Sequence, residues 1–131
     1  MKGIALAFFA LALLAGLCGM LWGIEMAATQ NHLMAPAHAH LDLLGWVSCA
    51  IFGFYYHLVP GASAGLLPRA HFVLAATGLV TIVPGIAIAV SGGGEALAGI
   101  GSILTVLSML SFAAVVLRRV RPVQPASARM A

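Results

Sequence analysis

The chain alternates between four long apolar runs and short segments rich in glycine, proline or polar residues. Each run is long enough to cross a hydrocarbon core of about 30 Å as a helix that rises about 1.5 Å per residue. Pro36 suits the first turn of a helix, whereas Pro60 and Gly61 end one, and residues 91–94 form a glycine-rich turn. The pattern therefore predicts four helices, at about residues 4–28, 36–59, 68–90 and 95–118.

The composition indicates that these helices span a membrane. Of the 131 residues, 63% are hydrophobic and only 7% are charged, and the mean hydropathy is +1.10. Water-soluble domains do not have this balance. We predict an all-α, polytopic membrane protein with a single domain over residues 1–131, in which four transmembrane helices form a bundle or an arc. The lipid bilayer is therefore one of its expected partners.

The basic residues indicate an orientation in that bilayer. Lys2, Arg69 and the basic tail at 119–131 fall on one side of a four-helix arrangement, while the connections near Gln30 and Gly93 contain no Lys or Arg. The positive-inside rule then places both termini in the cytoplasm, and we expect a bacterial-type inner (plasma) membrane. The tail is interpreted as a topogenic, lipid-facing cluster, and no nucleic-acid partner is expected.

Two histidines and a carboxylate lie just inside the second run, near the outer face in this orientation. Ionisable groups at membrane depth are rare and usually mark a functional site. Residues i and i+2 of an α-helix are about 200° apart around its axis, so His38 and His40 cannot chelate one metal together. If both are ligands, they serve two different sites. Asp42, one turn below His38, is placed to accept the second ring N–H of His38 and to fix its tautomer.

The face of the second helix below His40 is predicted to be a wide apolar wall. It contains Leu44, Val47, Ile51, Phe54 and Leu58. A single imidazole above such a wall suits a flat macrocycle that lies along the helix with its metal bound to Nε2. The opposite face is predicted to carry His38, Asp42, Gly45, Cys49, Phe52 and Tyr56.

Two other interpretations of these polar residues are open. Glu25, His32 and one of the paired histidines could supply three ligands to copper or zinc, provided that the loop at 29–35 folds back over the helix ends. Alternatively, the histidines and Asp42 are half-hydrated residues of the outer interface with no ligand.

The remaining histidines, His57 and His71, flank the short inner loop. They lie about 25 Å from His40 along the axis and cannot join its site within one subunit. We predict a structural role for each, against the alternative of a proton-entry or second metal site.

Small residues form stripes on the first and last helices. Gly19 and Gly23 form a GxxxG motif, and the last helix carries Gly99, Ser102, Ser108 and Ser111. Such stripes let helices approach closely, and packing within one chain explains them as well as oligomerisation does.

The second run also resembles a known family. Residues 37–48 (AHAHLDLLGWVS), followed by 52–56 (FGFYY) and Pro60, are similar to the haem-copper oxidase superfamily, in particular to small membrane proteins described as cytochrome-c-oxidase subunit I-like. In the large catalytic subunit of that superfamily, a His-x-His on one helix ligates two haems, one from each histidine. The resemblance therefore implies haem b as the cofactor, with His38 and His40 as axial ligands to haem iron.

The chain also departs from that family. The catalytic subunit has twelve helices in three arcs of four, whereas this chain has four. The histidines of a copper centre, a His-x-x-x-Tyr pattern and the paired arginines that hold haem propionates are all missing. We therefore do not expect a catalytic oxidase. The expected function is that of a small cytochrome in electron transfer or haem handling, with a possible respiratory electron-transfer partner.

The helix count predicts an oligomer. Three copies of four helices give twelve, so a closed homotrimer could imitate the oxidase subunit. In such a ring, His38 of one protomer and His40 of the next would bind opposite faces of one haem, with Glu25 and His32 near its propionates. The alternatives to this cytochrome are a copper- or zinc-binding protein and a structural or assembly subunit of a respiratory complex.

Overall fold

The computed structural model describes residues 1–119, and all of its secondary structure is helical. The helices are α1 (Gly3–Thr29), α2 (Ala35–His40), a π-helical segment η1 (Leu41–Ser48), α3 (Cys49–Leu58), α4 (Leu66–Val90) and α5 (Ala96–Arg119). Because α2, η1 and α3 run on without a break, they form one span, and the chain has four helices long and apolar enough to cross a membrane. The prediction of four spans is confirmed, and the chain has the character of a multi-pass membrane protein. Most of the predicted basic tail lies outside the described residues.

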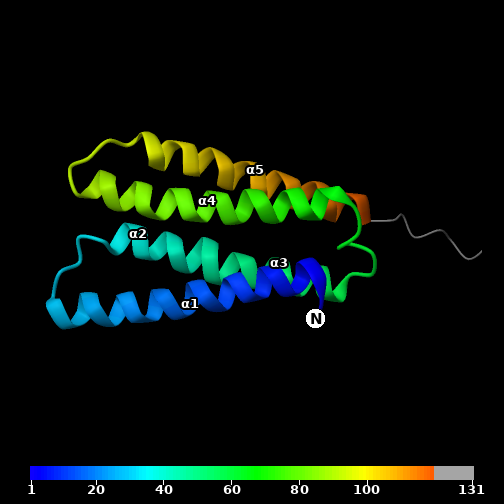
Figure 1. Cartoon of the computed structure of the whole chain (residues 1–131), viewed down its shortest axis with the longest axis horizontal. Helices are drawn as coiled ribbons and strands as arrows, with labels where there is room; N and C mark the ends of the chain where they lie inside the picture. The colour runs from blue at the N-terminus through cyan, green and yellow to red at the C-terminus, as the bar shows by residue number, and fades with distance from the viewer. Residues whose placement is uncertain (120–131) are drawn as a thin grey trace, which may run out of the picture.

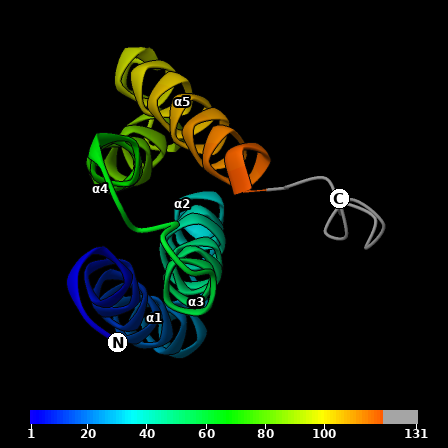
Figure 2. The ribbon, with the colours of Figure 1, turned by 90° about the vertical axis from the view of Figure 1, so that its right-hand side faces the viewer.

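The four spans are arranged as an open row (Figures 1 and 2). The α2–η1–α3 span packs on α1 along one side and contacts α4 on the other, and α4 packs along α5. The helices at the two ends of the row, α1 and α5, share no extended contact. This arrangement corresponds to the arc, rather than the closed bundle, among the predicted alternatives.

Glycines set the close contact between α4 and α5. A Cβ added at Gly101 would lie 2.5 Å from the backbone N and Cα of Ile82, and one at Gly85 would lie 2.5 Å from the backbone N of Ala98. The two backbones therefore touch at these positions. The predicted stripe on the last helix is largely wrong. Of its four residues only Ser108 is buried. The side of the helix that faces α4 carries Gly101, Ser108 and Val115 instead.

The core is aromatic and lies towards the end of the row that holds the N-terminus. Phe8 is fully buried there, in T-shaped contact with Phe52 of α3 and Phe72 of α4. Phe112 of α5 reaches Phe52 at a ring-centroid distance of 4.6 Å. All four spans thus meet at this end of the molecule.

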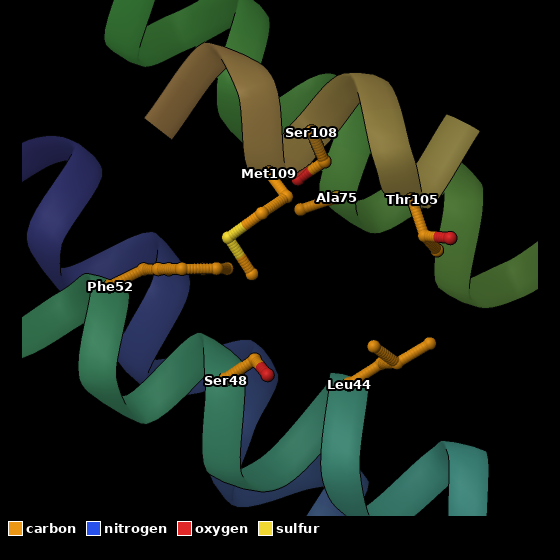
Figure 3. Close-up of a pocket in the computed structure, with 7 residues that line it drawn as sticks. All are labelled: Leu44, Ser48, Phe52, Ala75, Thr105, Ser108 and Met109. Carbon is orange, nitrogen blue, oxygen red and sulfur yellow. The ribbon is translucent and has the colours of Figure 1, made fainter. Parts of the chain in front are cut away.

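Towards the other end, a small cavity separates η1 and α3 from α4 and α5 (Figure 3). Its volume is about 30 Å³, which is room for water but not for a macrocycle. Two of its hydroxyls are engaged with the backbone, since Ser48 donates to the carbonyl of Leu43 and Thr105 to that of Ser102. This cavity is therefore not the site of a large cofactor.

The π-helical segment begins directly after His40, and the apolar pattern did not predict it. In η1 the backbone turn is wider, and the side chains of Ser48 and Cys49 hydrogen-bond to carbonyls five residues earlier, at 2.8 and 3.3 Å. Most π-helical segments are single turns inside α-helices, and they frequently occur at functional sites. One consequence is a correction to the predicted apolar wall, because Leu44 is half-buried and lines the small cavity.

Candidate functional site

His38 and Asp42 lie together on the side of their span that faces α1. His38 is in α2 and Asp42 is one turn later in η1, and Nε2 of His38 lies 3.3 Å from Oδ2 of Asp42. The predicted proximity of these side chains is confirmed. The carboxylate therefore holds one nitrogen of the imidazole ring, as carboxylates do for ligating histidines.

The glycine stripe of α1 makes room for this pair. A Cβ added at Gly19 would overlap Oδ1 of Asp42, and one at Gly23 would lie 3.5 Å from Cε1 of His38. One turn further back, a Cβ at Gly16 would lie 3.0 Å from the ring of Trp46. The GxxxG motif thus serves packing within one chain, and polar side chains lie directly over its glycines.

Two polar atoms of this pair have no partner. Nδ1 of His38 and Oδ1 of Asp42 are buried, and neither has a hydrogen bond within residues 1–119. A buried polar atom left unpaired costs about 1–3 kcal/mol. Such a cost is usually explained by a bound group or by function.

His40 lies on a different side of the span, as the spacing predicted. Its Nδ1 is 2.8 Å from the backbone carbonyl oxygen of Pro36. Because a carbonyl only accepts hydrogen bonds, Nδ1 carries the proton and donates it. In the neutral ring the lone pair is then on Nε2, which has no hydrogen-bond partner in the described part of the chain. Histidines that bind metals through Nε2 are held in this way.

The surface around His40 is apolar and exposed. Val47 and Ile51 are 41% and 56% exposed, and Phe54 and Leu58 continue the exposed surface along α3. Leu43, which the prediction did not include, is also exposed. Four of the five side chains that we predicted for the apolar wall are therefore exposed, and Leu44 is the exception.

Glu25 and His32 are both exposed, near the end of α1 and in the loop that follows it. Within residues 1–119, no group of three His, Cys, Asp or Glu side chains lies close enough to hold a metal ion. The three-ligand copper or zinc site built on these two residues is thus not assembled within the described part of one chain.

The sequence did not predict the environment of His71. This side chain is fully buried, and its Nδ1 lies 2.8 Å from the hydroxyl oxygen of Tyr56. Rings from the three other spans surround it, with Phe8 and Phe52 at centroid distances of 4.7 and 4.6 Å. Its Nε2 is buried without a hydrogen-bond partner inside residues 1–119. His57, in contrast, is exposed.

The pair of Tyr56 and His71 gives a test of how this core is stabilised. Tyr56→Phe removes the one hydrogen bond that the buried imidazole makes within residues 1–119, and we expect it to lower the free energy of unfolding by about 1–3 kcal/mol. The measurement is equilibrium unfolding in mixed detergent–SDS micelles. Tyr56→Phe combined with His71→Leu removes both polar partners and should recover most of the loss. A double variant less stable than Tyr56→Phe alone would contradict this account.

In comparisons with known proteins, no family model, curated protein or solved structure matches the chain.

Proposed function

We propose that this protein is a haem b-binding membrane cytochrome, resembling one third of a haem-copper oxidase subunit I, that acts in electron transfer or haem handling. One observation carries the proposal. On each of His38 and His40, one ring nitrogen faces a polar group of the same chain while the other has no hydrogen-bond partner among the described residues. The two histidines also lie on different sides of their span. The free nitrogen of His40 is Nε2 and that of His38 is the buried Nδ1, and we propose that both histidines bind haem iron.

The residues fit this cofactor on the outside of the row. His40 has its lone pair on Nε2 and lies beside exposed apolar side chains, which is the surface that a flat macrocycle covers. When bound, haem supplies one-electron redox chemistry, and ligation by two histidines leaves no open position on the iron. The chain's own groups orient the ligands, since Asp42 holds the His38 ring and the Pro36 carbonyl holds the His40 ring. Glu25 and His32 are exposed near the same end and are proposed to contact the propionates.

The open row supports a ring of three protomers. A row of four helices leaves its two end helices without a neighbour on one side, and α5 exposes Ile100, Ile103, Val106, Leu110 and Leu117. Contacts between unlike surfaces of successive protomers generate closed rings. In the proposed trimer, His38 of one protomer and His40 of the next bind the two faces of one haem.

The charges support the proposed orientation. Lys2, Arg69 and Arg118 lie at the end of the row that holds the N-terminus, whereas Glu25 and Glu95 lie at the other end (Figure 1). By the positive-inside rule, the N-terminal end faces the cytoplasm and the paired histidines lie near the outer face of a bacterial-type inner membrane.

The experiment is an absorption spectrum of the detergent-purified protein, oxidised and then reduced with dithionite, with a pyridine haemochrome assay. We expect the sharp reduced α-band of a low-spin b-type haem. His38→Ala and His40→Ala should each lower haem content at least several-fold, because each removes an axial ligand. His57→Ala is the matched control, since His57 is an exposed histidine at the far end of the same span. Mass measurement in detergent should give three chains.

Other results would replace this proposal. Colourless protein that takes up no haem on supplementation would exclude the cytochrome. Stoichiometric copper or zinc in such protein would favour the metal-binding alternative. Full haem content in both His38→Ala and His40→Ala would show that haem binds elsewhere on the chain.

A further inference from the structure

A second cavity lies at the opposite end of the molecule from the paired histidines. Its volume is about 60 Å³, and it lies between the loop that joins α3 to α4 and the end of α5. Arg118 and Arg119 line it on the α5 side, and Ala62 and Ala64 line it on the loop side. The guanidinium of Arg119 donates a hydrogen bond to the carbonyl oxygen of Gly61 and is thereby held at the cavity. Two arginines thus line the same small cavity.

These arginines have no acidic partner in the described part of the chain. The chain has three acidic side chains, those of Glu25, Asp42 and Glu95. Glu25 and Glu95 lie at the other end of the row, and Asp42 contacts His38 in the span between them. Within residues 1–119, no salt bridge involves an arginine. Arg118 and Arg119 are both exposed, so their guanidinium groups are free to bind an anion from outside the described part of the chain.

The start of α4 adds hydrogen-bond donors beside the same cavity. Gly65 is the N-cap of α4 and has no side chain to accept from the first turn, so the N–H groups of Leu66 and Leu67 have no side-chain cap. The partial positive charge at a helix N-terminus attracts anions. Leu67 and Pro68 of this first turn line the cavity together with the arginines. These donors are backbone N–H groups, so the fold fixes their positions and no flexible side chain is involved.

The rest of the lining is apolar. Leu67, Pro68 and Val115 form the wall on the side of the helices, and Val115 belongs to the buried core. Polar donors on one side and apolar side chains on the other match an amphiphile, whose charged group binds at the membrane surface while its chains extend along the helices. Basic pockets between transmembrane helices on the cytoplasmic side bind anionic headgroups.

We propose that this cavity binds the phosphate of an anionic phospholipid headgroup, through Arg118, Arg119 and the first turn of α4. The proposal is independent of haem binding, because the cavity and the paired histidines are at opposite ends of the molecule. The shared chemistry is a phosphate anion, so inorganic phosphate is the other source that the experiment has to distinguish.

The test is native mass spectrometry of the full-length, detergent-purified protein with added phosphatidylglycerol or phosphatidylcholine. We expect retention of phosphatidylglycerol in preference to phosphatidylcholine. An arginine near an anionic surface contributes about fivefold to affinity, so the Arg118→Gln/Arg119→Gln double variant should lose about 25-fold. Arg118→Gln alone leaves the Arg119–Gly61 contact in place and should lose about fivefold. Arg69→Gln is the matched control, because Arg69 is exposed near the start of α4 but does not line the cavity.

The outcomes separate the possibilities. Equal retention of the two lipids by the wild type, or equal retention of phosphatidylglycerol by wild type and Arg118→Gln, would overturn the proposal. A loss in Arg69→Gln as large as in Arg118→Gln would show a diffuse charge effect and would also overturn it. Millimolar inorganic phosphate that fails to displace the lipid supports a lipid site, whereas complete displacement assigns the cavity to free phosphate. Unchanged far-UV circular dichroism shows that the variants are folded.

Discussion

Replacing Gly101 by alanine is expected to lower the free energy of unfolding by about 1–3 kcal/mol. The added Cβ would lie 2.5 Å from the backbone N and Cα of Ile82. Backbone atoms inside a helix cannot move aside as the end of a side chain can, so α4 and α5 have to separate along this contact. Equilibrium unfolding in mixed detergent–SDS micelles measures the effect.

Gly99→Ala is the matched control on the same helix. Nothing lies within 4 Å of a Cβ at Gly99. Alanine is favoured over glycine within a helix by about 1 kcal/mol, so this variant should be as stable as the wild type or slightly more stable. If Gly99→Ala and Gly101→Ala destabilise the protein equally, the contact between α4 and α5 is not the one described here.

The second large effect concerns the proposed cofactor. Gly19→Ala should displace Asp42, because the new Cβ would overlap Oδ1 of that carboxylate. The His38 ring then loses the group that holds it, and we expect haem content to fall several-fold. Loss of an outer partner of a ligating histidine typically costs 10–100-fold in metal affinity. The haem-to-protein ratio from the pyridine haemochrome assay measures the effect.

Gly23→Ala tests whether the effect is specific to Asp42. A Cβ at Gly23 would lie 3.5 Å from Cε1 of His38, which is ordinary van der Waals contact. This variant carries the same substitution on the same stripe, one turn away, and should keep its haem. Haem loss in Gly23→Ala, or full haem content in Gly19→Ala, would count against the role proposed for Asp42.

Much of the candidate site could be predicted from the sequence. The i, i+2 spacing placed His38 and His40 on different sides, and the i, i+4 spacing placed Asp42 beside His38. Both follow from helix geometry, and in this chain the wider turn of η1 begins only after His40. The ligation of haem, the trimer and the family resemblance stay predictions, which the spectra, the mass and the variants above test.

Other features of the site depended on contacts that no local pattern encodes. Leu44 lies within η1 and lines the small cavity, which the apolar pattern did not predict. From the sequence, His71 was predicted to lie beside a short loop. It lies in the core, because rings from the three other spans pack against it. Gly19 and Gly23 looked like a helix contact, and only the neighbouring span shows that a carboxylate and an imidazole lie over them.

The sequence by itself determined the four spans, the membrane character and the separation of positive from negative charge between the two ends. Each of these follows from hydropathy, chain length and loop composition, which act locally and leave few alternatives in a bilayer. The tertiary structure alone decided the open row, the backbone contact at Gly101, the π-helical segment and the two arginines at one cavity. These features arise where separate spans meet, because the fit between their side chains, rather than hydropathy, selects one packing among several of similar polarity.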